Sequence, residues 1–175
     1  MYIKKQERNT RHGFALVELL VAISIIVILS VSLLFQQNKF DSSVQITNVA
    51  HEIASIIQQA QRYGASSAIG TSTDVGVSYG VHFDLDENNK GFILFRDLNN
   101  NGGYNNGELE EEYTIAGNTV ISAISTSGTN RSSVTIVFVR PDPEPSTPAQ
   151  IIIENEGETR TVEVSRTGQV QVINN

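Results

Sequence analysis

The hydrophobic and polar positions divide the chain into three patterns, and the first is a long apolar run. Residues 14–35 read FALVELLVAISIIVILSVSLLF, in which sixteen of 22 residues are Phe, Leu, Ile or Val and only Glu18 is charged. As a helix this run would be about 33 Å long, enough to cross the hydrocarbon core of a bilayer. We therefore expect residues 14–35 to form a transmembrane helix.

The second pattern is amphipathic and predicts a helix over residues 36–70. Apolar residues recur every three or four positions, which is the period of one helix face. These residues are Val44, Ile46, Val49, Ala50, Ile53, Ile56, Ile57, Ala60 and Tyr63. No proline occurs before Ala68, and Gly64 and Gly70 mark the expected end. We expect one long helix, with its first half in a membrane or filament and its second half clamped to a globular head.

From about residue 75 the period changes to two, which is typical of half-buried strands. The expected strands are 75–83, 91–96, 111–116, 119–125, 133–139, 150–154, 159–165 and 169–173. Short successive strands joined by tight turns favour an antiparallel sheet. The expected fold class is therefore α+β, with one long N-terminal helix packed on a β-rich head over residues 71–175.

Turn signals separate these strands. Gly117-Asn118 and Thr167-Gly168 are expected to form hairpin turns. All four prolines lie within residues 141–148, so residues 140–148 are expected to form a stiff, exposed connection with polyproline-like structure.

Charge is distributed unevenly between the start of the chain and the rest. Residues 1–13 carry a net charge of +3, whereas residues 14–175 hold eight basic and eighteen acidic residues, a net charge of −10. A basic leader favours a cytoplasmic N-terminus and a head outside the cytoplasm. The acidic head argues against broad contact with nucleic acid or anionic lipid.

Composition and motifs also bear on chemistry. The chain has no Cys, which excludes a disulfide scaffold, a thiolate zinc site and a thiol nucleophile. It shows no nucleophile elbow, phosphate loop or metalloprotease motif, and its three His are far apart in sequence. We do not expect an enzyme.

Glu18 is the residue that a plain membrane anchor does not explain. A carboxylate inside an apolar span indicates a function that involves a partner. If the chain were cut between Gly13 and Phe14, the new α-amine would lie four residues from Glu18, and opposite charges attract strongly in a low dielectric. The amine would come from the same chain or from a neighbour. A secretory signal peptide fits less well, because FQQNKF follows the run instead of a small-residue cleavage site.

The basic leader that ends in Gly13, followed by FALVELLVAISIIVIL, resembles a type IV prepilin. In that family a Gly precedes the cleavage site, the next residue becomes the N-methylated N-terminus, and an acidic residue is the fifth residue of the mature chain. Gly13, Phe14 and Glu18 match these three positions. Ala15 replaces the Thr or Ser that is usual after the new N-terminus. The resemblance implies removal of residues 1–13 by a prepilin peptidase at the inner membrane. It also implies assembly with other pilin subunits into an extracytoplasmic filament, and a type IV pilin-like fold.

The head is similar to the GspH/FimT-type minor pseudopilins. The matching positions are Gly91, Phe92, Phe95, Asp97, Asn99, Asn101, Gly102, Gly107 and Glu108, followed by Thr167 and Gly168 in the late hairpin. That likeness implies a structural subunit of a type IV pilus or a type II secretion pseudopilus. DNA-uptake members carry Arg where this chain has Gln169 and Gln171, so a DNA-uptake minor pilin is the weaker alternative and nucleic acid is not an expected partner.

Residues 97–108 fit a twelve-position calcium loop, with Gly102 at position six. The expected ligands are Asp97, Asn99, Asn101, the carbonyl of Gly103, Asn105 and Glu108. Only the first and last carry charge, so calcium binding would be weak. Asn and Gly are also the usual residues of turns, and a plain turn stays open as an alternative. A metal-binding loop would also suit an uncleaved, membrane-anchored calcium-binding surface protein.

Overall fold

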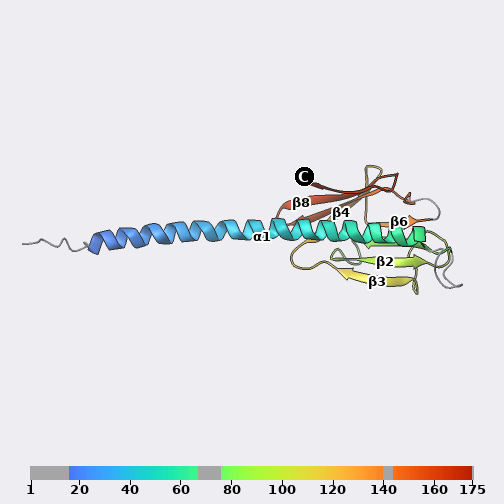
Figure 1. Ribbon diagram of the computed structural model, residues 1–175, viewed down its shortest axis with the longest axis horizontal. Coiled ribbons are helices and arrows are strands. Elements are labelled where there is room, and N and C mark those ends of the chain that lie inside the picture. The colour runs from blue at the N-terminus through green and yellow to red at the C-terminus, as the bar shows by residue number, and fades with distance from the viewer. Residues whose placement is uncertain (1–15, 67–75, 140–143, 175) are drawn as a thin grey trace, which may run out of the picture. The chain divides into compact units, whose positions relative to one another are not determined.

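The computed structural model describes residues 16–66, 76–139 and 144–174, and gives only the helical backbone for residues 33–40. The chain forms two compact units, Met1–Phe40 and Asp41–Asn175. Helix α1 spans Leu16–Ser66 (Figure 1). The strands are β1 (Ser78–Asp84), β2 (Gly91–Asp97), β3 (Leu109–Thr114), β4 (Val120–Thr126), β5 (Thr129–Arg131), β6 (Ser133–Phe138), β7 (Ala149–Asn155), β8 (Glu158–Val164) and β9 (Val170–Asn174).

The strands form two antiparallel sheets. The first sheet has the order β3-β2-β1-β6 and the second β5-β4-β7-β8-β9. Strands β1 to β3 form a meander in the first sheet, and β4 and β5 then lie in the second sheet. Strand β6 belongs to the first sheet again, where it pairs with β1. The chain ends in the second sheet with the meander β7 to β9, of which β7 pairs with β4. Residue pairs such as Val81↔Leu94 and Ile151↔Val162 set aliphatic side chains opposite each other on the inward faces.

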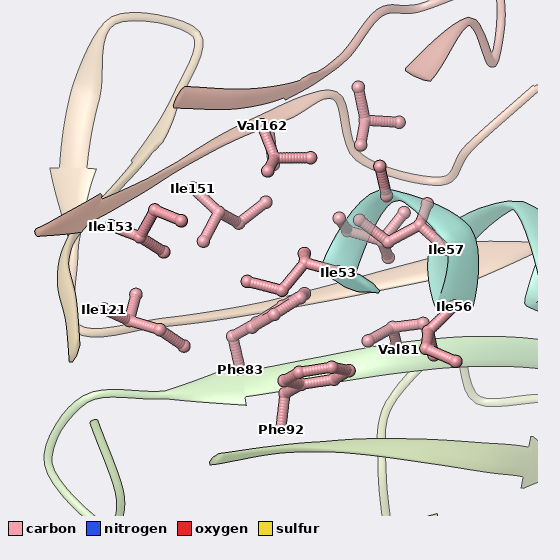
Figure 2. Close-up of a cluster of buried hydrophobic side chains, with 14 of the residues drawn as sticks. Ile53, Ile56, Ile57, Val81, Phe83, Phe92, Ile121, Ile151, Ile153 and Val162 are labelled. Carbon is pink, nitrogen blue, oxygen red and sulfur yellow. The ribbon is translucent and has the colours of Figure 1, made fainter. Parts of the chain in front are cut away.

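The core forms where the second half of α1 meets both sheets. Ile53 and Ile57 of α1 are fully buried, and Figure 2 shows them among Phe83 of the first sheet and Ile151 and Val162 of the second. The helix therefore supplies the apolar surface on which both sheets close. On its outer side the same helix exposes residues such as His51 and Glu52, as its amphipathic pattern predicts.

The structure confirms the α+β fold, but the strands form two sheets instead of one, and two local features also differ from the prediction. Strand β5 was not predicted, and Gly117-Asn118 does not close a hairpin, because β3 and β4 belong to different sheets. The β4–β5 hairpin instead turns at Ser127-Gly128, where both residues have positive φ (51° and 78°), as a type I′ turn requires. Thr167-Gly168 does turn between β8 and β9 as predicted, with Gly168 N–H donating to the carbonyl of Ser165 at 3.1 Å.

Replacing Ile53 with Ala should remove the contact on which both sheets close. Since Ile53 is 0% exposed, we expect the free energy of unfolding to fall by about 2–5 kcal/mol. Urea unfolding measures the change, and Val44→Ala on the same helix serves as the control because Val44 is 43% exposed. Equal effects of the two substitutions would contradict this account of the core.

Candidate functional site

The candidate assembly surface lies on the first half of α1. Gly13 and Phe14 fall outside the described residues, whereas Glu18 lies in the first turn of α1 and is exposed. The aliphatic side chains around it are exposed as well: Leu16, Val17, Leu19, Leu20, Val21, Ile23, Ile25, Ile26, Val27, Ile28, Leu29 and Val31. A continuous apolar surface of this size in water requires cover from another chain or from lipid.

No helical stretch within the residues described by the structure is long and apolar enough to cross a membrane.

The second candidate site, the loop between β2 and β3, is held by its own two carboxylates. Both oxygens of Asp97 accept backbone N–H groups, from Asn101 at 3.0 Å and from Gly102 at 2.9 Å. Glu108 accepts the N–H of Leu98 at 3.1 Å and that of Asn105 at 2.9 Å. Asp97 is 2% exposed and Glu108 5% exposed. Charged acceptors on backbone N–H groups form strong hydrogen bonds, so the loop has internal support of its own.

The same loop covers the outer face of the first sheet. Tyr104 packs edge-to-face on Phe95 and stacks on His82, with ring centroids 5.6 Å apart in each pair. Phe95 is consequently fully buried although it lies outside the main core. Gly80 makes this arrangement possible, because a Cβ there would lie 2.7 Å from Cε1 of Phe95. The loop is thus a structural cover, a role that its sequence did not indicate.

The structure places all six predicted calcium ligands in this one loop, and their oxygens are of the kind that calcium prefers. The carboxylates, however, are already engaged with backbone N–H groups. Among the described residues, no three His, Cys, Asp or Glu side chains are grouped so that they would hold a metal ion. Calcium binding therefore stays a prediction.

Substituting Asp97 with Ala tests two hypotheses about the loop: that the Asp97 carboxylate stabilises it through hydrogen bonds, and that the loop binds calcium. Loss of two hydrogen bonds to a buried carboxylate should lower the free energy of unfolding by about 2–4 kcal/mol even when a chelator is present. Urea unfolding in calcium and in chelator measures this, with the exposed Asp86→Ala as the control. Unchanged stability of Asp97→Ala in chelator would contradict the hydrogen-bond account. Identical wild-type stability with and without calcium would contradict metal binding.

His82 is the titratable group that lies under the cover. It is half-buried, and its Nδ1 lies 2.8 Å from Oγ1 of Thr135. Burial lowers the pKa of His82 below its usual 6.5, and the nearby carboxylates of Asp84 and Glu87 partly offset that shift. The folded protein therefore favours the neutral imidazole.

Stability should decline as the pH falls through the range in which His82 titrates. Because the pKa is lower in the folded chain than in the unfolded chain, the unfolded chain binds more protons just below pH 6.5, and this favours unfolding. We expect the free energy of unfolding to fall between pH 7 and pH 5, and to fall less in His82→Gln. Chemical denaturation at each pH measures this, and equal slopes for the two proteins would count against the role of His82.

The β8–β9 turn presents amides where DNA-uptake relatives are expected to carry cations. Gln169 and Gln171 are exposed, and Nε2 of Gln171 donates to Glu163 at 2.6 Å. Glu163 also accepts Nε2 of Gln150 at 3.2 Å, so this face of the second sheet displays a carboxylate between two amides. Such a surface offers little attraction to phosphate, although the exposed Arg166 lies in the turn itself.

A helix whose first half exposes aliphatic side chains, and whose second half packs on antiparallel sheets, defines the class of type IV pilin-like proteins. Residues 8–34 match the model of the prokaryotic N-terminal methylation motif, and residues 49–168 match that of GspH, a type II transport protein. The chain belongs to the GspH family, whose model covers more than half of its length. It is accordingly a structural subunit of the pseudopilin type, and membership implies assembly with other pilin-like subunits.

Comparison with solved structures supports the same fold. The minor pseudopilin EpsH from the type 2 secretion system of Vibrio cholerae is similar, with a TM-score of 0.52 and 12% sequence identity over 74% of this chain and 97% of that chain. At this identity the likeness concerns the fold alone. No curated protein matches the chain.

Proposed function

We propose that this protein is a minor pseudopilin, cut after Gly13, methylated on Phe14, and assembled through the first half of α1 into a pseudopilus of the type II secretion kind. The observation that carries the proposal is the overlap of two features. The segment that matches the N-terminal methylation motif, residues 8–34, includes the stretch of α1 that exposes aliphatic side chains.

Support for the secretion pseudopilus over the type IV pilus comes from the GspH family and from the likeness of the fold to EpsH. Support for a structural role without catalysis comes from the same family. The amides of Gln169 and Gln171 and the net charge of −10 over residues 14–175 favour this role over DNA uptake.

The apolar run of residues 14–35 would hold the subunit in the inner membrane before assembly, with residues 1–13 in the cytoplasm and the head outside. Its partners at this stage would be the prepilin peptidase and the membrane. In the filament, neighbouring helices would replace lipid around the same aliphatic side chains.

Glu18 would neutralise the new α-amine of Phe14, from its own chain or from a neighbour. A free amine and a free carboxylate are each costly in an apolar surrounding, and their pairing removes both penalties only in one geometry. The pairing would therefore select a defined axial position for each incoming helix.

Processing is tested by the mass and N-terminal residue of the protein recovered from native membranes. We expect a chain that begins at N-methyl-Phe14, because the motif places the cut after Gly13. Gly13→Leu should block the cut and leave residues 1–13 attached. Recovery of the wild type with residues 1–13 intact would instead favour the uncleaved, membrane-anchored surface protein.

The role of Glu18 is tested by Glu18→Gln, which keeps the shape and removes the charge. We expect normal cleavage but loss of the subunit from sheared filament fractions, measured by immunoblot against the membrane fraction. Glu52→Gln is the matched control, since Glu52 lies on the same helix and is exposed on the head. Equal incorporation of Glu18→Gln and wild type would remove Glu18 from the assembly mechanism while leaving the processing result untouched.

A further inference from the structure

The loop between β2 and β3 contains both Asn-Gly pairs of the sequence, Asn101-Gly102 and Asn106-Gly107. Asn-Gly is the dipeptide most prone to spontaneous deamidation, because glycine has no side chain to hinder attack of its backbone nitrogen on the preceding carboxamide. The reaction needs only water. Its rate depends on whether that nitrogen and that carboxamide are free to meet, so two identical pairs in one loop allow a direct comparison.

Hydrogen bonds hold the first pair. The N–H of Gly102 donates to Oδ2 of Asp97 at 2.9 Å, and Asp97 is 2% exposed. Oδ1 of Asn101 accepts the N–H of Gly103 at 2.8 Å, so the carboxamide is engaged as well. Attack would require the Gly102 nitrogen to leave a carboxylate and to lose its proton beside that negative charge. The first pair is therefore protected by the fold of the loop.

The second pair lies at the centre of an exposed turn. The N–H of Glu108 donates to the carbonyl of Asn105 at 3.1 Å and closes the turn, while Asn106 and Gly107 between them are exposed. The hydrogen bond of such a turn joins its first and last residues and does not engage the N–H of the third. Among the described residues, none accepts the N–H of Gly107 or bonds the carboxamide of Asn106. Both reacting groups are therefore free.

We propose that Asn106 is a site of spontaneous deamidation and that the fold protects Asn101 from the same reaction. The Gly107 nitrogen attacks Cγ of Asn106 and forms a new N–C bond. The bond from Cγ to Nδ2 breaks, and the proton of the Gly107 nitrogen leaves with Nδ2 as ammonia. Water then opens the succinimide ring at either carbonyl, which gives aspartate or isoaspartate. The net reaction consumes water and releases ammonia, and nothing is oxidised or reduced.

Either product changes the turn at the end of the loop. A new negative charge appears two residues before Glu108, in the segment whose expected calcium ligands include Asn105 and Glu108. Isoaspartate also inserts its β-carbon into the backbone, so the hydrogen bond that closes the turn cannot keep its geometry. The reaction occurs within a single subunit, and its test is therefore independent of the proposed function.

The experiment follows the two sites in the folded full chain in detergent micelles, incubated in a mildly alkaline buffer. Chymotrypsin cleaves after Tyr104, so the two pairs fall in different peptides whose masses report conversion. We expect Asn106 to convert about tenfold faster than Asn101 or more, because breaking one hydrogen bond to a charged acceptor slows attack by roughly that factor. Equal rates at the two sites in the folded chain would overturn the proposal.

Asn106→Gln is the matched control variant, because glutamine would have to form a larger ring and cyclises far more slowly. It should abolish conversion of its peptide, and conversion that persists there would assign the reaction to Asn105 and overturn the proposal.

The same measurement on the chain unfolded in urea separates fold from sequence. Without the Asp97 hydrogen bond, the rates at Asn101 and Asn106 should converge. A contrast as large in urea as in the folded chain would make it a property of sequence and overturn the role given to the fold. Conversion of Asn106 in urea but not in the folded chain would equally overturn the proposal, since the turn would then protect it.

Discussion

Burial of the aliphatic stripe of α1 against both sheets is the contact on which the rest of the head depends. Each sheet presents inward residues such as Phe83 and Ile151 that need a second apolar layer, and the helix supplies that layer to both at once. The strands are short, and a short antiparallel sheet without such a layer is only marginally stable.

The sequence was sufficient for the elements whose signal is local and periodic. The stripe around Ile53 predicted the helix because one helix face is buried and the opposite face is exposed, and the alternation around Val81 predicted β1. The sequence was insufficient to predict β5, which is only three residues long. The turn before β5, at Ser127-Gly128, lacks the Asn that is usual at the first position with positive φ. The sequence also did not predict the division of the strands between two sheets, since no local pattern indicates which strands pair.

The candidate sites likewise differ in whether a local sequence pattern was sufficient to find them. Gly13, Phe14 and Glu18 were found because their motif is contiguous in the chain and specific. The calcium pattern of residues 97–108 was found for the same reason, but the pattern did not reveal that Asp97 and Glu108 hold backbone N–H groups, because Asn and Asp serve turns and metals alike. The two Asn-Gly pairs of this loop are identical in sequence, and only the fold shows that the N–H of Gly102 binds the Asp97 carboxylate.

The packing of Tyr104 over Phe95 has a consequence for subunits that lie close to one another. A bare aromatic ring on the surface of a protein that assembles with other subunits is a point of adhesion. Phe95 would form such a point on the outer face of the first sheet if the loop lacked its tyrosine. The closure of residues 97–108 thus removes one aromatic ring from the surface by which closely packed subunits would adhere to one another.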